Sequence, residues 1–307
     1  MHEPAEYFDW AECDRCGLAY LSPPVPEQDI GRFYVDYLPH RGPSAWGIWS
    51  WIVAASEAAT DRARLATLRR AAPVHSTSAV LDVGCGRPTF LRRVAHATRA
   101  RTVGTDTSDD GWRTTPDRWT GLELHAGELE SLDLQGPFTH ITMWHALEHL
   151  YRPLDTLRYL RSLVTAKHPA ACPERSVGAL PHAPSAARGP CRLVIEVPDY
   201  DSITRREFGG YWAGYHTPRH TAAYTPATLR ALLERAGWRL EKQYQWGTLD
   251  PWLLIWLSHG ERAGHDFSGP MQSRFPAFLA GKVMALPLTL QQRRRPLGIQ
   301  TAIAVAA

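Results

Sequence analysis

The chain has 307 residues, enough to bury one large hydrophobic core with appendages, so its length suggests one or two domains. Its 44% hydrophobic and 21% charged residues are ordinary for a soluble globular protein. A net charge of +3 without a strongly basic face does not favour a nucleic-acid partner. There is no transmembrane-length apolar run, no signal peptide at the polar amino terminus and no disulfide framework in the five cysteines. These features predict a cytoplasmic protein.

Residues 1–40 are rich in proline and aromatic side chains and show no regular period. Cys13 and Cys16 form a Cys-x-x-Cys pair in the middle of this segment. One such pair supplies only two of the four ligands of a structural zinc site, and His2 could add a third. We therefore expect an irregular segment with a degenerate cysteine pattern.

A tryptophan-rich segment follows over residues 41–75, with a helix expected from about residue 45 to 72. Its first half is apolar, and its second half alternates arginine with leucine and alanine. We expect this helix to form a lid whose tryptophans shape an apolar or sugar-binding surface. The tryptophans concerned are Trp46, Trp49 and Trp51, together with Trp212 from later in the chain.

Residues 76–246 alternate short apolar strands with segments of helical period, which predicts a parallel sheet with right-handed crossovers. Pro198 ends the parallel series, because proline cannot donate to a sheet ladder. A last strand near 301–305 would form a terminal antiparallel pair with the strand at 238–246. The other expected strands are 79–83, 101–106, 121–125, 138–144 and 192–197, and the expected helices are 89–98, 153–165 and 226–236.

Two stretches interrupt this alternation. Residues 166–191 contain five prolines and mostly small residues without a period, so we expect a disordered loop. Residues 247–307 carry a carboxy-terminal insertion before the last strand. Its apolar run at 252–257 and its arginines at 293–295 could make a peripheral membrane contact, but a core helix and a solvated turn are the expected arrangement.

The most informative stretch is 79–91, where a buried strand ends at a glycine-rich turn and a helix begins. Gly84 and Gly86 let the backbone approach a ligand, and backbone amides converge there with the positive end of the helix. Asp82 suits a ligand that carries an ammonium group and would repel a pyrophosphate. Thr89 occupies the place of the third glycine of a dinucleotide-binding motif, which argues against NAD.

Asp106 ends the next strand, about twenty residues beyond the glycine turn, as is typical of a ribose-binding carboxylate. Its two oxygens can accept hydrogen bonds from both hydroxyls of a ribose. The alternative is an ordinary surface aspartate in a turn.

The stretch Ala-Val-Leu-Asp-Val-Gly-Cys-Gly-Arg-Pro-Thr-Phe-Leu at 79–91 resembles motif I of class I S-adenosylmethionine-dependent methyltransferases. The resemblance covers roughly residues 10–250 and implies a doubly wound α/β fold with a seven-stranded, mostly parallel sheet. Pro88 departs from it, because the family has a third glycine there and proline lacks an amide donor. The resemblance implies that S-adenosylmethionine contacts Asp82, Gly84, Cys85, Gly86, Asp106, Glu128, Trp144 and His145.

A second element, Trp144-His-Ala-Leu-Glu-His149, looks like part of a bacterial methyltransferase family related to the ubiquinone-pathway O-methyltransferases. Those relatives carry Glu-x-x-Glu-His, which binds a divalent ion, whereas His145 stands at the first acidic position here. His145, Glu148 and His149 would share one face of a helix and could hold a metal ion. We expect no metal, with His145 against the cofactor and the other two shaping the turn or acting as a base.

The resemblance extends to the loop after the fifth strand, which contains His216-Thr-Pro-Arg-His220 and roofs the acceptor pocket in this fold. Methylation of a hydroxyl needs a base, and histidine has a suitable pKa near neutrality. His149, His216 and His220 are the candidates. Each alone could be a cap or a backbone-bonded side chain, but the three together indicate catalysis.

Some relatives also begin with a zinc ribbon that holds two cysteine pairs. Cys13-Asp-Arg-Cys-Gly-Leu looks like the second half of such a ribbon. We expect a degenerate remnant of the ribbon rather than a zinc site.

The sequence thus predicts an S-adenosylmethionine-dependent methyltransferase acting on a small-molecule acceptor, with oxygen preferred to nitrogen. Natural-product intermediates, quinone-like phenols and glycans fit better than nucleic acid. Two alternatives stay open: a catalytically inactive cofactor-binding protein of the same fold, impaired by Pro88 and the insertion, and an NAD-dependent oxidoreductase. The oligomeric state does not follow from the sequence.

Overall fold

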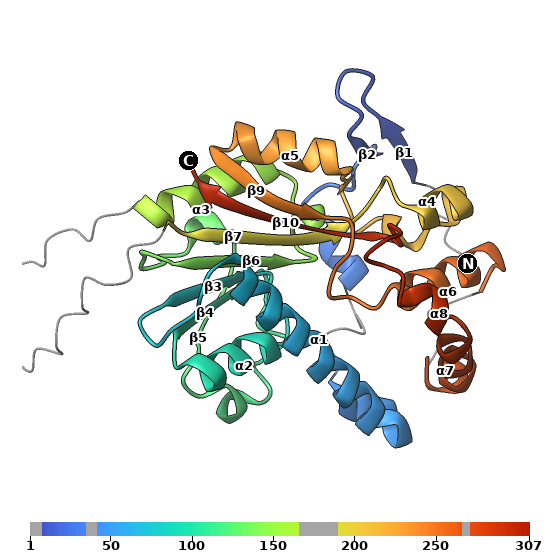
Figure 1. Ribbon diagram of the computed structural model, residues 1–307, viewed down its shortest axis with the longest axis horizontal. Coiled ribbons are helices and arrows are strands. Elements are labelled where there is room, and N and C mark those ends of the chain that lie inside the picture. Colours follow the sequence, from blue (N-terminus) through green and yellow to red (C-terminus); the bar gives the residue numbers. More distant parts are fainter. Residues whose placement is uncertain (1–7, 35–41, 166–189, 266–270) are drawn as a thin grey trace, which may run out of the picture.

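A central sheet of seven strands organises the computed structural model, which describes residues 8–34, 42–165, 190–265 and 271–307. The strands of this sheet are β3 (Ala79–Val83), β4 (Arg101–Asp106), β5 (Glu123–Ala126), β6 (His140–Trp144), β7 (Arg192–Pro198), β9 (Trp238–Tyr244) and β10 (Ile299–Ala306). Their order is β5-β4-β3-β6-β7-β10-β9 (Figure 1). Only β10 runs antiparallel to its neighbours, β7 and β9. The predicted doubly wound, mostly parallel sheet with a terminal antiparallel pair is confirmed.

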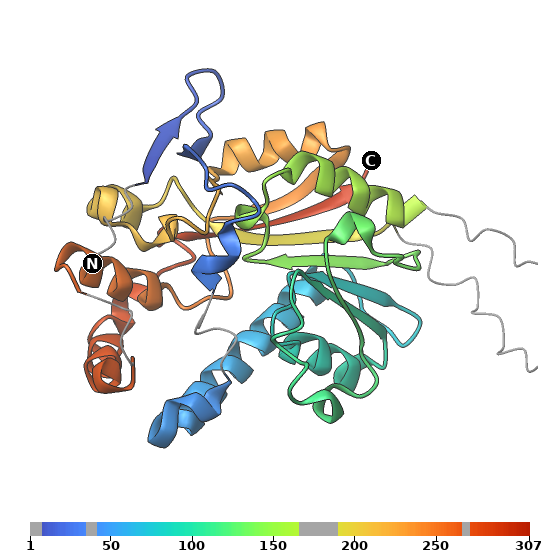
Figure 2. The same cartoon turned by 180° about the vertical axis from the view of Figure 1, so that it is seen from behind.

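Helices cover both faces of the sheet, with α1 and α2 on one side and α3 and α5 on the other (Figures 1 and 2). Alternate residues of β3 show how the strands serve both layers. Leu81 packs in the core beneath α3 and α5, whereas Val80 packs in the core beneath α1 and α2. These helices are α1 (Ser50–Ala71), α2 (Thr89–Thr98), α3 (Pro153–Thr165) and α5 (Pro226–Arg235).

The amino-terminal segment is more regular than the sequence suggested. Strands β1 (Asp9–Glu12) and β2 (Ala19–Ser22) form a hairpin, and β2 pairs with the short strand β8 (Ala222–Ala223) in a second, three-stranded sheet. The expectation of an irregular segment is wrong here, because β8 supplies an edge on which the hairpin pairs. Cys13 and Cys16 lie in the hairpin turn as free thiols, and His2 lies outside the described residues.

The carboxy-terminal insertion folds as helices beyond the carboxyl ends of the parallel strands, beside α4 (Figure 1). The apolar run at 252–257 lies in α6, where Trp252, Leu254 and Ile255 are buried, as expected of a core helix. Apart from Pro190 and Cys191, the loop expected at 166–191 lies outside the described residues. The helices of this region are α4 (Ile203–Phe208), α6 (Pro251–Arg262), α7 (Phe275–Met284) and α8 (Leu286–Thr289).

Short 3-10 turns complete the chain and carry several residues of the candidate site. Within the described residues, no helix combines the length and the apolar character that crossing a bilayer requires. The 3-10 segments are η1 (Ile30–Tyr34), η3 (Pro43–Trp49), η4 (Pro116–Trp119), η5 (Leu129–Ser131), η6 (Leu147–His149), η7 (Gly209–Tyr211), η8 (Ala213–Tyr215) and η9 (Met271–Arg274).

A buried carboxylate joins several segments at the carboxyl end of β7. Glu196 is fully buried and accepts hydrogen bonds from the backbone N–H of Thr248 (2.7 Å), the Thr248 hydroxyl (2.8 Å) and the Thr301 hydroxyl (3.3 Å). Its Oε1 lies 3.2 Å from Nε2 of His145. Burial opposes ionisation of Glu196, but His145 and the hydrogen-bond donors outweigh burial and hold its pKa below the usual value.

His145 is the cationic partner in this cluster. Its Nδ1 lies 3.3 Å from Oε1 of Glu148, so the ring stands between two buried carboxylates. Burial alone would lower the pKa of His145, but Glu148 and Glu196 overcome this effect and raise the pKa to about 9. The ring is therefore charged at neutral pH.

We predict that Glu196→Gln destabilises the fold and changes its pH dependence. Removing one partner of a buried ion pair lowers the free energy of unfolding by about 3–5 kcal/mol. In the wild type the unfolded histidine releases its proton near its ordinary pKa of about 6.5, whereas folded His145 keeps its proton up to about pH 9. The contribution of this pair to the free energy of unfolding is therefore fully present below pH 6.5 and is lost as the pH rises towards 9.

Urea unfolding at pH 6.5 and at pH 9 measures this effect, and the Glu196→Gln variant should lose less stability between the two than the wild type. The control is Glu207→Gln, because exposed Glu207 pairs with Arg262 at 3.7 Å on the surface. Parallel losses in the wild type and Glu196→Gln would contradict the assigned charge on His145.

Candidate active site

The turn between β3 and α2 is closely packed at Gly84 and open at Gly86. Gly84 has φ +72°, and a Cβ on it would lie 2.7 Å from the Cβ of Ala146; Gly86 has φ +48°, and no atom lies within 4 Å of the position a Cβ would take there. The amides of Gly84 and Cys85 donate to the carbonyl of Thr105 at 2.8 and 3.0 Å, which joins the turn to β4. The Cys85 side chain is buried, and burial raises the pKa of its thiol, so the thiol is protonated at neutral pH, and contact of its backbone with a ligand stays a prediction.

Asp106 and Glu128 lie at the ends of neighbouring strands beside this turn. Oδ2 of Asp106 accepts a hydrogen bond from the amide of Gly86 at 2.8 Å. The amide of Gly127 donates to the carbonyl of Asp106 at 2.9 Å, which places exposed Glu128 next to it. The structure therefore brings together the glycine turn and the two carboxylates predicted for the sugar and the base of the cofactor.

Two other predicted cofactor residues lie beneath the turn. Asp82 is only 3% exposed and accepts a hydrogen bond from the Thr142 hydroxyl at 2.6 Å, and burial raises the pKa of Asp82 to about 7. Trp144 is buried, with its ring edge-on to Phe90 at a centroid distance of 5.5 Å. Their observed contacts support the turn from within the core, and direct contact with a ligand stays a prediction.

The structure corrects the arrangement expected for His145, Glu148 and His149. These residues do not share a helix face, because His145 has φ +55° and the 3-10 turn η6 begins only at Leu147. His145 is held by the carboxylates of Glu148 and Glu196. Its ring therefore points into the ion-pair cluster and away from His149.

The three histidines predicted as bases do come together. The ring centroids of His149 and His220 are 4.5 Å apart, those of His216 and His220 are 4.9 Å apart, and those of His149 and His216 are 6.3 Å apart. His149 ends η6, after β6, and the other two lie between η8 and β8. Two loops beyond the carboxyl ends of the parallel strands thus build one cluster.

Backbone contacts orient two of these rings. Nδ1 of His149 lies 3.1 Å from the carbonyl oxygen of Arg219, and Nδ1 of His220 lies 2.9 Å from that of Gly214. A carbonyl can only accept a hydrogen bond, so these contacts place the proton on Nδ1 and leave a lone pair on Nε2. Both rings therefore have Nε2 available as a base or as a ligand.

Burial keeps all three histidines neutral at pH 7. It lowers the pKa of His216 to about 3 and the pKa of His220 well below the ordinary value. Burial also lowers the pKa of His149, against an opposing effect of the Glu148 carboxylate. The near-neutral pKa expected from the sequence is thus wrong for His216 and His220, because desolvation disfavours their charged forms.

Glu148, His149 and His220 have the chemistry of a metal site. Each offers a ligand atom, and these atoms lie within 4.8 Å of one another. Glu148 is 1% exposed, and neither of its carboxylate oxygens accepts a hydrogen bond within the described part of the chain. Two histidines and one carboxylate are a common ligand set of catalytic zinc. The residues present therefore fit a divalent ion, with His220 in the place expected for His145.

The sequence did not predict two further residues of the cluster. The Tyr34 hydroxyl lies 2.8 Å from Nδ1 of His149, and Nη1 of Arg219 lies 3.0 Å from Nε2 of His216. Arg219 sits inside the His-Thr-Pro-Arg-His element and could have been included on that basis. No local pattern marks Tyr34, which reaches the cluster only through the packing of η1.

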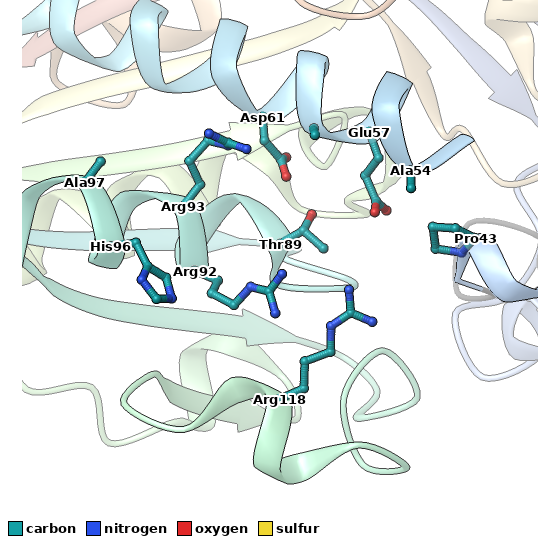
Figure 3. Close-up of a pocket in the computed structure, with 11 residues that line it drawn as sticks. Pro43, Ala54, Glu57, Asp61, Thr89, Arg92, Arg93, His96, Ala97 and Arg118 are labelled. Atoms are coloured by element: carbon teal, nitrogen blue, oxygen red, sulfur yellow. The ribbon is translucent and has the colours of Figure 1, made fainter. Parts of the chain in front are cut away.

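A separate cavity of about 490 Å³ lies between α1 and α2 and contains none of the predicted site residues (Figure 3). Glu57 and Asp61 point into it from α1 and face charged side chains of α2 and of η4. The ion pair between Arg87 and Glu57, at 2.6 Å, connects its wall to the glycine turn. The cavity is lined by Pro43, Ala54, Glu57, Ala58, Asp61, Thr89, Arg92, Arg93, His96, Ala97 and Arg118.

Comparison with solved structures agrees with this architecture. A chain from the complex of the Haloferax volcanii Trm112 methyltransferase activator with a methyltransferase matches with a TM-score of 0.51 and 15% identity, over 85% of this chain and 97% of that chain. Mycolic acid cyclopropane synthase CmaA1, solved with SAH and CTAB, matches with a TM-score of 0.51 and 12% identity, over 79% of this chain and 83% of that chain. At these identities the likeness shows the fold alone.

Family membership follows from the sequence itself. No curated protein sequence matches the chain. The family described as "Methyltransferase domain" matches residues 55–243, which is more than half of the chain and includes the glycine turn and the histidine cluster. The chain therefore belongs to this methyltransferase family and is a class I S-adenosylmethionine-dependent methyltransferase.

Proposed function

We propose that this methyltransferase transfers the methyl group to a hydroxyl oxygen of a small molecule. The observation that carries the proposal is the cluster of three neutral histidines beside Glu148, of which His220 is buried and His149 and His216 are half-buried. A hydroxyl is a poor nucleophile until it loses its proton, whereas a free amine needs no base, so a neutral histidine beside the acceptor favours oxygen. The small net charge of +3 supports a small molecule over a nucleic acid.

The cofactor would lie along the carboxyl ends of β3, β4 and β5. The glycine turn would hold its methionine part, Asp106 the ribose hydroxyls and Glu128 the adenine. Asp82, with a pKa of about 7, would lose its proton when the cofactor's ammonium group binds above it. The SAH in the CmaA1 structure supports this class of ligand for the shared fold.

Methyl transfer then requires alignment and one proton acceptor. The bond between the methyl carbon and the sulfonium sulfur breaks as a bond to the acceptor oxygen forms, and S-adenosylhomocysteine leaves. Nε2 of His149 takes the hydroxyl proton, and the neighbouring Glu148 carboxylate stabilises the imidazolium that results. Tyr34 and the Arg219 carbonyl hold the ring in position from the Nδ1 side.

The inactive alternative finds no support at Pro88. This residue precedes α2 with φ −77°, its carbonyl accepts from the amide of Arg92 at 3.0 Å, and the helix begins at Thr89 as predicted. Proline is tolerated at such a position, because the first amides of a helix lack helical partners. The family match likewise favours a methyltransferase over an NAD-dependent oxidoreductase.

The buried carboxylate of Glu148, which pairs with His145 at 3.3 Å but accepts no hydrogen bond within the described residues, favours a second role for the same cluster. We infer that Glu148, His149 and His220 can hold a divalent ion such as zinc. Such an ion would act as a Lewis acid on the acceptor hydroxyl. The backbone carbonyls on Nδ1 of both histidines are the supporting contacts that metal-binding histidines usually have.

Asp106→Ala should weaken S-adenosylhomocysteine binding about 10- to 100-fold, because it removes a charged acceptor of two ribose hydrogen bonds. Isothermal titration calorimetry measures the affinity. Asp155→Ala is the matched control, since exposed Asp155 on α3 pairs with Arg158 at 3.5 Å far from the turn. Unchanged affinity in Asp106→Ala would refute the ribose assignment.

His149→Gln should lower kcat about 100- to 10,000-fold at neutral pH and leave cofactor affinity unchanged, since only the proton acceptor is lost. Transfer of labelled methyl to phenolic and sugar hydroxyls measures kcat. In the wild type, kcat should fall at acidic pH as His149 becomes protonated, and the variant should lack this fall. Exposed His75→Gln is the control, and full activity of His149→Gln would exclude its role as base.

Zinc occupancy tests the metal role. After incubation with zinc and gel filtration, the wild type should retain about one ion per chain by elemental analysis, and Glu148→Gln and His220→Ala should lose it. A Cys13→Ser/Cys16→Ser variant separates this site from the hairpin thiols and should retain the ion. Retention that depends only on the cysteines would contradict the metal role of Glu148.

A further inference from the structure

Large apolar side chains are exposed on two neighbouring helical segments. Trp51 at the start of α1 is 69% exposed, Met284 at the end of α7 is 83% exposed, and Leu290 after α8 is 73% exposed. Scattered exposed apolar residues are normal, but a contiguous set marks an interaction site. We call this set the apolar tip; it consists of Ile48, Trp51, Val283, Met284, Leu286 and Leu290.

The two segments form one structural unit. The ring of Phe275, at the start of α7, lies 5.3 Å from the ring of Trp46 and 5.4 Å from that of Trp49. The side-chain amide of Gln272 donates to the carbonyl of Ala45. In both Figure 1 and Figure 2 the start of α1 and helix α7 project from the same end of the molecule.

The composition of α7 and α8 does not match their burial. Lys282 is the only charged residue in Phe-Pro-Ala-Phe-Leu-Ala-Gly-Lys-Val-Met, the sequence of α7, and α8 reads Leu-Pro-Leu-Thr. A helix that is apolar on all sides normally lies in a protein core or in lipid. Here only Phe275 is buried in α7, and no residue of α8 is buried. These helices therefore have a large apolar surface that the described residues leave uncovered.

The segments that carry the tip contain basic residues and no acidic ones. Residues 42–56 and 271–307 contain no aspartate or glutamate, although the whole chain has 31 of them. Arg294 and Arg295 are exposed just after Leu290, and Arg293 lies over the ring of Trp246 at 5.0 Å. Lys282 pairs with Asp250 at 2.6 Å. The basic residues of the second stretch are Arg274, Lys282, Arg293, Arg294 and Arg295.

We propose that the apolar tip docks on the surface of an anionic lipid bilayer. The apolar side chains enter the boundary between headgroups and acyl chains, and Arg294 and Arg295 lie against lipid phosphates. A second copy of the chain fits this surface less well, because two tips face to face would place arginine against arginine, and the nearby Asp250 is already paired with Lys282 of its own chain. The docking surface shares the arginines at 293–295 with the one that the sequence raised, but not the 252–257 run, whose Trp252, Leu254 and Ile255 are buried in α6.

Co-sedimentation of the full chain with phospholipid vesicles tests the proposal. The protein should bind vesicles that contain phosphatidylglycerol more tightly than vesicles of phosphatidylcholine alone, and added salt should reduce the difference. The double variant Trp51→Ser/Met284→Ser should bind at least about tenfold more weakly, because two apolar side chains no longer enter the lipid. Arg294→Gln/Arg295→Gln should bind phosphatidylglycerol vesicles more weakly and phosphatidylcholine vesicles unchanged.

Tyr20→Ser is the matched control, since Tyr20 on β2 is an exposed aromatic residue in the three-stranded sheet, outside the tip, and it should bind like the wild type. Circular dichroism verifies that each variant is folded. Failure of the wild type to sediment with anionic vesicles, or equal binding by the wild type and Trp51→Ser/Met284→Ser, would overturn the proposal. So would light scattering that shows a wild-type dimer which the same double variant converts to a monomer.

Discussion

A single buried charge pair determines how the chain is arranged at the carboxyl ends of the parallel strands. Glu196 lies within the central sheet, where an unpaired carboxylate would be costly, so His145 must stay beside it. To reach that position the chain turns sharply after β6, and His145 adopts φ +55°. The same turn sends Glu148 to the other side of the imidazole ring and His149 towards the loop after β7. The positions of Glu148 and His149 follow from this arrangement, whereas contacts within the loop after β7 place His216 and His220.

The cluster shows how one residue type takes opposite charge states within a few ångströms. His145 stands between two carboxylates at 3.2 and 3.3 Å and has a pKa of about 9, whereas desolvation lowers the pKa values of His149, His216 and His220, which are neutral. A cation and a set of neutral bases therefore coexist around one carboxylate, Glu148. Because the two kinds of histidine differ in charge, the loop after β6 can stabilise the fold through His145 and offer the lone pair of His149 to a reacting hydroxyl or to a metal ion.

Features that depend on local pattern could be predicted from the sequence, and those that depend on distant contacts could not. The glycine turn, Asp106 and the mostly parallel character of the sheet follow from alternating strands and helices with a glycine-rich corner. Tyr34 reaches His149 across 115 residues, and no local signal marks that contact. The hairpin at β1 and β2 depends on pairing with β8. The possible metal set that the sequence offers includes His145 only if a helix stands where the chain makes a tight turn, and His220 takes that place from another loop.

The position of β10 has a consequence for biosynthesis. This strand lies between β7 and β9 in the middle of one half of the sheet, yet it is formed by residues 299–306. While a ribosome still holds these residues, β7 and β9 lack their shared neighbour, and each presents an open row of backbone amides and carbonyls. The nascent chain therefore passes through a stage with two unpaired edges, and a chain truncated before residue 299 would keep them permanently open to aggregation.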